Sequence, residues 1–343
     1  MLIRKGLSEM KRVTMADVAE KANVSKSTVS QYLNNRFDYM SKQTRDRIKI
    51  AIEELGYQPN FVARSLKQKS TSTIGVIVAN ILHTFSTQVL RAIEDYFNEH
   101  GFHAIVCNSY NDPVKELRYL EMLRAKQVDG LIVVPTGGNL DVYQRMIDEQ
   151  FPLVFMDRIV EELRVDSILL DNEAASFIAV QHLKEKGYYR LGILTSSLKG
   201  NITPRIERVK SFRKALQMFN LPIYEDFIQG YEQNEYQFRL KELLSLPQPP
   251  EALLAGNDFS LMEILQFVKD HRIVIPEQLA VISVDEVSFA DIYSPGLTTI
   301  NQPTFEMGTQ AAEMLWKKIK KEHNQSTNII HRFKPELVVR DSC

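Results

Sequence analysis

Short apolar runs alternate with longer amphipathic stretches along most of the chain, from Thr73 onward. Apolar runs bounded by turn residues are typical of buried parallel strands, and the stretches between them have the period of helices. The predicted strands are 74–79, 104–107, 131–134, 153–155, 191–194, 252–255 and 280–284. The predicted helices are 87–100, 114–125, 142–149, 174–186, 207–219, 236–244, 261–271 and 305–321. Repeated strand–helix units predict two successive doubly wound parallel sheets, with the second series starting after 167–170.

The first seventy residues have a different pattern, which predicts three short helices. Each of these helices begins at a residue that can cap it, and the last one ends at a glycine. These residues are Thr14 (with Asp17 completing a capping box), Ser25, Ser41 and Gly56. Asn23 tolerates left-handed backbone and suits the tight turn between the first two helices. Three short helices with such a turn are typical of a helix-turn-helix domain that reads the major groove.

Charge separates the same two parts of the chain. The first seventy residues contain 14 basic and 7 acidic residues, a net charge of +7, and the remainder carries −8. This asymmetry predicts a polyanion-binding domain joined to an acidic sensor. The second helix, 26–33, has hydrogen-bond donors and no carboxylate on its outer faces, which suits contacts to phosphates and base edges. These donors are Lys26, Ser27, Thr28, Ser30 and Gln31. The alternative is an ordinary helical hairpin with a solvated face.

Composition narrows the class of protein. A length of 343 residues, 44% of them hydrophobic and 25% charged, is typical of a globular protein of two or three domains without a membrane span. Only Cys107 and Cys343 are present, too few for a disulfide scaffold or a zinc cage, so we expect a cytoplasmic protein. Because no dinucleotide-binding, P-loop, zincin or serine-hydrolase motif occurs, we expect neither an enzyme nor a cofactor or metal.

Residues 13–30, VTMADVAEKANVSKSTVS, closely resemble the headpiece of the lactose-repressor (LacI/GalR) family. The resemblance continues through Thr44-Arg45, through 56–60 and 63–66, and over nearly the whole chain. It implies an all-α helix-turn-helix domain (10–58), a hinge helix and linker (59–72), and an effector-binding and dimerisation domain (73–343). Family members usually begin near Met10, so residues 1–9 are interpreted as an extension or a misplaced start.

The resemblance also implies that the body consists of two α/β lobes like those of periplasmic sugar-binding proteins. The chain is expected to cross between the lobes more than once. Lobe one is expected to contain about 73–169 and 302–332, and lobe two about 170–301 and 333–343.

The DNA-contacting positions of the family can be transferred one by one. Lys26 and Ser27, with Gln31 one turn later, match base-reading positions, and a lysine favours guanine whereas a glutamine favours adenine. Thr14, Ser30, Asn34 and Tyr57 match positions that contact the DNA backbone. The loop 35–40 is one residue longer than in the lactose repressor, so no phosphate contact is carried over there.

The hinge is expected to form a short helix, 61–66, capped by Asn60. A helix of this length is unstable alone, and in the family it forms on the operator. Leu66 then matches the residue that wedges into the central base step, and Val62 and Ala63 match hinge-to-hinge and minor-groove contacts. The alternative is that Leu66 is a plain apolar linker residue.

Polar side chains follow the predicted strands of the body at the edge where parallel sheets bind ligands. Those that match effector-facing positions of the family are Phe85, Ser86, Asp157, Arg158, Asn257 and Asp285. Arg208 matches the arginine of an Arg-x-x-Gly-aromatic signature, in which Ser211 replaces the glycine here. Arg205 adds a third guanidinium to those of Arg158 and Arg208. Three guanidiniums near one pocket favour an anionic sugar derivative.

The expected partners are double-stranded operator DNA, a second copy of the chain and a sugar or sugar-acid effector, with no membrane. The chain also resembles repressors of ketodeoxygluconate and pectin-sugar operons. The expected function is repression of a carbohydrate-utilisation operon, relieved when a sugar-acid inducer releases the protein from a palindromic operator. Two alternatives remain. One is a neutral sugar, with the arginines paired to Asp157, Asp285 and Glu207, and the other is a phosphocarrier-protein corepressor.

Overall fold

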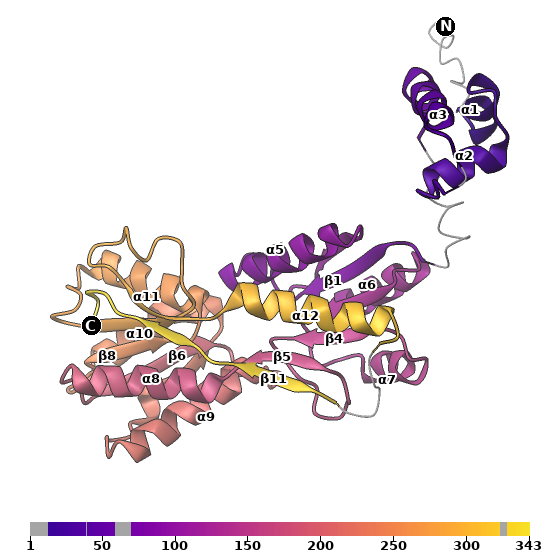
Figure 1. Cartoon of the computed structure of the whole chain (residues 1–343). Helices are drawn as coiled ribbons and strands as arrows, with labels where there is room; N and C mark the ends of the chain where they lie inside the picture. Colours follow the sequence, from indigo (N-terminus) through magenta and orange to yellow (C-terminus); the bar gives the residue numbers. More distant parts are fainter. Residues whose placement is uncertain (1–12, 39, 59–69, 323–327) are drawn as a thin grey trace, which may run out of the picture. The chain divides into compact units, whose positions relative to one another are not determined.

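The computed structural model describes residues 13–38, 40–58, 70–322 and 328–343. The chain forms two compact units, which divide between Thr71 and Ser72 (Figure 1). The first unit contains helices α1 (Met15–Lys21), α2 (Lys26–Leu33) and α3 (Lys42–Leu55). In the part of the chain that the structure describes, no helix has both the length and the apolar character needed to cross a bilayer.

The helix ends of the first unit confirm the predicted capping residues. The Thr14 side chain and the Asp17 side chain form a reciprocal capping box at the start of α1. The amide of Thr28 donates to Ser25 Oγ at 3.1 Å, which caps α2. Asn23 and Gly56 both adopt the left-handed backbone, with φ of 50° and 61°. Fully buried side chains from all three helices then form one small core, namely Val18, Val29 and Ile48.

The second unit contains two six-stranded sheets, as the alternating pattern predicted. The first sheet has the order β11-β5-β4-β3-β1-β2 and is parallel at every recorded pairing. Its strands are β1 (Thr73–Val78), β2 (His103–Asn108), β3 (Gly130–Val133), β4 (Leu153–Met156), β5 (Ser167–Leu170) and β11 (Ile330–Phe333). Its helices are α5 (Thr84–Glu99), α6 (Pro113–Ala125), α7 (Leu140–Asp148) and α12 (Thr304–Ile319). This sheet and these helices form the first lobe.

The second lobe is built around the other sheet, in the order β12-β10-β9-β8-β6-β7. Its strands are β6 (Leu191–Ser196), β7 (Ile228–Tyr231), β8 (Ala252–Ala255), β9 (Ala280–Val284), β10 (Thr298–Asn301) and β12 (Glu336–Val338). Its helices are α8 (Asn172–Glu185), α9 (Thr203–Met218), α10 (Tyr236–Leu244) and α11 (Asp258–His271), with short 3₁₀ turns at Glu225–Phe227 and Gln233–Glu235. Only β12 runs antiparallel to its recorded neighbour, β10.

The apolar pattern did not predict five of these strands, namely β5, β7, β10, β11 and β12. Strand β5 does contain an apolar run, at 168–170, but the pattern there is interpreted as the point after which the second series begins. Strands β7 and β10 contain polar residues or glycine within four residues, and β11 and β12 carry polar side chains at exposed positions, so no apolar run marks these four. Strands β11 and β12 show where the chain crosses between the lobes. Phe333 pairs with Leu170 in the first sheet and Leu337 pairs with Ile300 in the second. By pairing, Leu170 and Phe333 belong to the first lobe, one residue beyond the limits expected for it.

Helix α12 brings the late part of the sequence back onto the first lobe, where it packs along α5 (Figure 1). Its buried face includes Met307, Ala311 and Leu315. The two helices approach closely at Gly308, where an added Cβ would lie 2.7 Å from the carbonyl oxygen of Val89. The absence of a side chain at this position therefore sets the distance between α5 and α12.

We predict that Gly308→Ala lowers the free energy of unfolding by about 1–3 kcal/mol, because the backbone of α5 must move. Alanine otherwise favours a helix over glycine by about 1 kcal/mol, so the measured loss is the cost of the clash less this gain. Urea denaturation measures it. Gly296→Ala is the matched control, because its added Cβ meets Arg340 at an ordinary 3.4 Å. Equal unfolding midpoints for the two variants would contradict the prediction.

Candidate effector cleft and nucleic-acid interface

The outer face of α2 presents the side chains predicted to read bases. Lys26, Ser27 and Gln31 are exposed, whereas Thr28 and Ser30 are half-buried. The first turn of α2 contains no acidic residue. A helix can contact base edges and phosphates directly if its exposed face carries hydrogen-bond donors and no carboxylate. The outer face of α2 meets this requirement.

The residues predicted to contact the DNA backbone range from exposed to buried. Thr14 is exposed, although its hydroxyl donates to Asp17 at 2.8 Å within the capping box. The Asn34 side chain donates to the carbonyl oxygen of Ser30 at 2.7 Å. Tyr57 packs in the core of the first unit with 7% of its surface exposed, which the sequence did not indicate. The predicted hinge positions, Asn60, Val62, Ala63 and Leu66, lie outside the described residues.

All eight side chains predicted to face an effector line one pocket between the two lobes, which we call the inner pocket. They are Phe85, Ser86, Asp157, Arg158, Arg205, Arg208, Asn257 and Asp285. The inner pocket has a volume of about 50 Å³. The structure thus brings together residues from helix α5, helix α9 and the loops after β4, β8 and β9, because carboxyl ends of parallel strands meet at one edge of each sheet.

Three guanidiniums surround the inner pocket, and their hydrogen bonds go mostly to uncharged oxygens. Arg158 Nη1 and Nη2 donate to the Pro135 carbonyl at 3.1 Å and to Asn111 Oδ1 at 2.7 Å. Arg208 Nε donates to Asn172 Oδ1 at 2.8 Å, and its Nη1 to the Gly256 carbonyl. Arg205 Nη1 donates to the Ser197 carbonyl at 2.7 Å. These contacts fix the orientation of the guanidiniums without neutralising their charge.

Arg158 is the most strongly perturbed of the three. Its burial lowers the pKa to about 10, against the opposing effect of Asp157. Its Nε lies 4.0 Å from Asp157 Oδ2 and has no hydrogen-bond partner among the described residues. A buried N–H without an acceptor is costly, so this atom is a place where a ligand oxygen is favoured.

Asp285 is the most buried carboxyl group of the inner pocket. It accepts hydrogen bonds from the backbone amide of Asp258 and from the side chain of Gln302. Burial and the nearby Asp258 raise the pKa of Asp285, while Arg208 opposes the rise.

A contact between the lobes borders the inner pocket, and the sequence did not indicate it. Asp258, at the start of α11, accepts from His83 Nδ1 at 2.5 Å and from the backbone amide of Thr84 at 2.8 Å. His83 makes no side-chain cap of its own for α5. A carboxylate of the second lobe therefore caps a helix of the first. His and Asp lie 175 positions apart, so no local pattern reveals their pairing.

A second and larger space, the outer chamber, adjoins the inner pocket and shares His83, Ile202 and Arg205 with it. Its volume is about 390 Å³. Aromatic side chains line it from both lobes, namely Tyr110, Tyr231, Tyr236 and Phe259. Amide and hydroxyl side chains supply most of the remaining lining, namely Asn80, Asn111, Thr136, Ser196, Ser197 and Gln233.

Two family models match the chain. The model of bacterial regulatory proteins of the lacI family matches residues 14–60, and a periplasmic binding protein-like domain matches 180–343. The probable HTH-type transcriptional regulator EndR of Paenibacillus polymyxa is 43% identical over 333 residues, covering 96% of this chain and 98% of that protein. This chain belongs to the lacI family of bacterial regulatory proteins.

Other relatives agree with this assignment. The HTH-type transcriptional regulator KdgR of Bacillus subtilis (strain 168) is 34% identical, covering 89% of this chain and 91% of that protein. The lac repressor dimer bound to operator and an anti-inducer shares the fold with a TM-score of 0.81 at 23% identity, over 97% of this chain and 99% of that one. The present lacI-family chain is a DNA-binding transcriptional regulator and not an enzyme.

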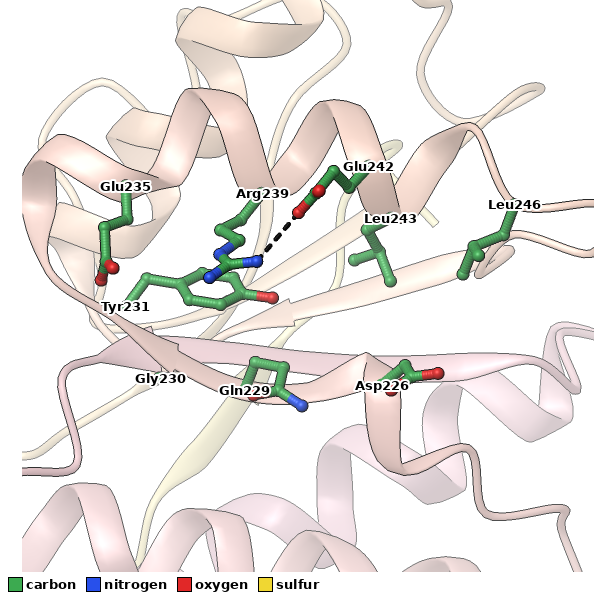
Figure 2. A pocket seen from close by; sticks show the side chains of 9 residues that line it. All are labelled: Asp226, Gln229, Gly230, Tyr231, Glu235, Arg239, Glu242, Leu243 and Leu246. Atoms are coloured by element: carbon green, nitrogen blue, oxygen red, sulfur yellow. Dashed lines mark hydrogen bonds and ion pairs between the residues drawn. The ribbon is translucent and has the colours of Figure 1, made fainter.

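A third space in this lacI-family regulator, the surface hollow, lies between β7 and α10 and has a volume of about 430 Å³ (Figure 2). Three carboxylates line it, from Asp226, Glu235 and Glu242, against one cation, Arg239. Arg239 already donates to Glu242 at 3.0 Å. An acidic hollow of this kind repels an anionic ligand, so among these spaces the inner pocket is the site suited to one.

The contact between Asp258 and His83 predicts a pH dependence. Burial alone would raise the pKa of Asp258, but the hydrogen bonds from His83, Thr84 and Phe259 outweigh it and hold the pKa below its ordinary value of 3.8. A lowered pKa contributes stability that is present above pH 3.8 and is lost as pH falls through the folded-state pKa.

We therefore predict that Asp258→Asn lowers the free energy of unfolding at pH 7 by about 1–3 kcal/mol, and that this difference shrinks below about pH 4. Urea denaturation across a pH series measures it. The exposed Asp270, on the same helix, supplies the matched control Asp270→Asn. Identical pH profiles for the two variants would show that the contact with His83 contributes nothing.

Proposed function

We propose that this regulator represses a carbohydrate-utilisation operon and is released from a palindromic operator by a sugar-acid inducer bound in the inner pocket. The observation that carries the proposal is the convergence of Arg158, Arg205 and Arg208 on that pocket. Guanidiniums bind carboxylates through paired, charge-assisted hydrogen bonds, which are about twice as strong as neutral ones.

The surroundings of the arginines support an anion over a neutral sugar. The neutral-sugar alternative requires the arginines to pair with Asp157, Asp285 and Glu207. Glu207 instead accepts from Arg332 at 2.6 Å, outside the inner pocket. Asp157 forms an ion pair with Arg158 at 4.0 Å, which is too long for a hydrogen bond and leaves the buried Nε without an acceptor among the described residues. A ligand carboxylate would supply the missing acceptor and the missing negative charge.

Release from the operator depends on how much more tightly the inducer binds the DNA-free form of the regulator than the DNA-bound form. Two copies would bind the two halves of a palindrome in the cytoplasm, each placing α2 in a major groove, with the first lobes in contact through α5. An inducer acts by binding the non-DNA state more tightly. A shift from 1:99 to 99:1 needs a difference of about 5.5 kcal/mol. A phosphocarrier-protein corepressor would not need the three arginines, and it remains the competing outcome.

Calorimetry tests the proposal directly. The titrants are galacturonate, glucuronate, gluconate and ketodeoxygluconate, each beside the neutral sugar or alcohol that has a hydroxymethyl group in place of the carboxylate. The proposal expects at least one acid to bind, and to bind at least about tenfold more tightly than its neutral analogue. Binding of phosphocarrier protein alone, or of neutral sugars alone, would overturn it.

We predict that Arg208→Met shifts the response to the acid to much higher concentrations and leaves operator binding intact. Methionine keeps the volume of the buried side chain but removes its charge and its donors, which costs about 10- to 100-fold in effector affinity. The control is Arg213→Met on the same helix, because Arg213 contacts Glu225 at the surface. Induction of Arg208→Met at an unchanged acid concentration would remove this arginine from the effector site.

A second prediction concerns the base-reading face. Lys26→Ala should relax discrimination at one base position by about 1–3 kcal/mol. The exposed Lys42 at the start of α3 gives the control Lys42→Ala. Affinities for a set of operators with single base changes measure the effect. A loss spread evenly over all sequences would mean that Lys26 contacts phosphate instead.

A further inference from the structure

The inner pocket is too small to hold the whole effector. Its volume is about 50 Å³, whereas ordinary ligand pockets have about 300–1,000 Å³. The outer chamber, at about 390 Å³, falls within the usual range on its own. The inner pocket thus has room for a small anionic group, and the body of the ligand must lie in the outer chamber.

The two spaces together run along one edge of the second sheet. The inner pocket is lined after β10 by Gln302, after β9 by Asp285 and after β8 by Asn257. The outer chamber continues the row at the ends of β6 and β7, with Ser196 and Tyr231. Five adjacent strands span about 19 Å at the usual separation of about 4.8 Å, which is several times the width of one sugar ring.

Charge changes along this row. The inner pocket has three arginines against Asp157 and Asp285, a formal excess of one positive charge. Arg205 lines both spaces and is counted here with the inner pocket, so the outer chamber has Lys199 against two carboxylates, Glu232 and Glu263, a formal excess of one negative charge. Lys199 and Glu232 already pair with each other at 3.6 Å. The charged end of a ligand therefore belongs in the inner pocket, and an uncharged part suits the outer chamber.

The walls of the outer chamber suit a sugar ring. Aromatic faces pack against the apolar faces of flat hydroxylated rings, while amide and hydroxyl groups bond to their edges. Tyr110 from the first lobe is 56% exposed, and the Lys115 ammonium covers one face of its ring at 4.3 Å from the centroid. Phe259 from the second lobe is held edge-on by the His83 ring at 4.3 Å. Each lobe thus contributes an aromatic side chain.

We infer that the effector is an acidic oligosaccharide of at least two rings, whose charged terminal ring places its carboxylate in the inner pocket while a further ring lies in the outer chamber. The inference rests on the proposed function, since it takes the inner pocket to bind a carboxylate. The two spaces meet at His83, Ile202 and Arg205, whereas Tyr110 and Tyr231 line the outer chamber alone, so contact with these two aromatic side chains is assigned to the further ring.

Calorimetry on the full chain tests chain length separately from charge. One pair of titrants is galacturonate and α-1,4-linked digalacturonate. The other is glucuronate and cellobiouronate, in which the second ring is neutral. Cellobiose, a disaccharide without a carboxylate, is the fifth titrant. The expected result is that in at least one pair the disaccharide binds about tenfold more tightly than its monosaccharide, and more tightly than cellobiose.

A variant then locates the second ring. Tyr110→Asn removes the aromatic side chain and retains a residue that tolerates the left-handed backbone at this position, where φ is 55°. It should lower the ratio of disaccharide to monosaccharide affinity about fivefold. Tyr189→Asn is the control, because Tyr189 is equally exposed, at 56%, and lines neither space. That variant should keep the ratio of the unmodified protein.

The possible failures are distinguishable. Equal affinity for the monosaccharide and disaccharide acids in both pairs would overturn the inference about length and leave the sugar-acid effector standing. An unchanged ratio in Tyr110→Asn would overturn the placement of the second ring in the outer chamber. Binding of cellobiose without binding of any acid would overturn the proposed function, and the inference with it.

Discussion

The enclosure of three guanidiniums between two lobes, with Arg158 and Arg208 buried and Arg205 half-buried, is the constraint on which this molecule depends. A cation removed from water loses several kcal/mol of solvation unless charges or hydrogen bonds replace it. Arg158, Arg205 and Arg208 recover part of that cost through backbone carbonyls and amide side chains. The oxygens of these carbonyls and amides carry no formal charge, so they do not cancel the excess positive charge in the pocket. That excess is what a ligand anion would complete.

The fold supplies these acceptors at the right place. Both sheets are almost entirely parallel, so the loops that follow their strands gather at a single edge of each lobe. The Asp258 carboxylate then crosses from one lobe to the α5 terminus of the other, and Thr203 joins the lobes at Ile159. These contacts join the two lobes at the border of the pocket. A ligand that binds one relative position of the lobes more tightly than another will therefore shift the lobes toward that position.

Helix caps and turns were predictable from the sequence, because the residues that form them are close together in the chain. The capping box of Thr14 and Asp17 needs residues three apart, and Asn23 needs only its own backbone preference. The eight pocket residues were also predicted. Strand ends and the family resemblance together indicated six of them, the family signature indicated Arg208, and Arg205 was added as a third guanidinium. Long-range contacts were not predictable. The partners of Arg158 lie 23 and 47 positions away, and no periodicity relates His83 to Asp258. The burial of Tyr57 likewise depends on three helices meeting around it.

One comparison tests most directly whether an unneutralised pocket controls DNA binding. The full chain is first bound to labelled DNA from upstream of the regulator's own gene. The tightest-binding sugar acid is then titrated into one sample of this complex and its neutral hydroxymethyl analogue into another, and the anisotropy of the label reports release of the DNA. A pocket that requires an anion predicts release by the acid at a concentration at least about tenfold lower than that of the analogue. Release by both at the same concentration would contradict it.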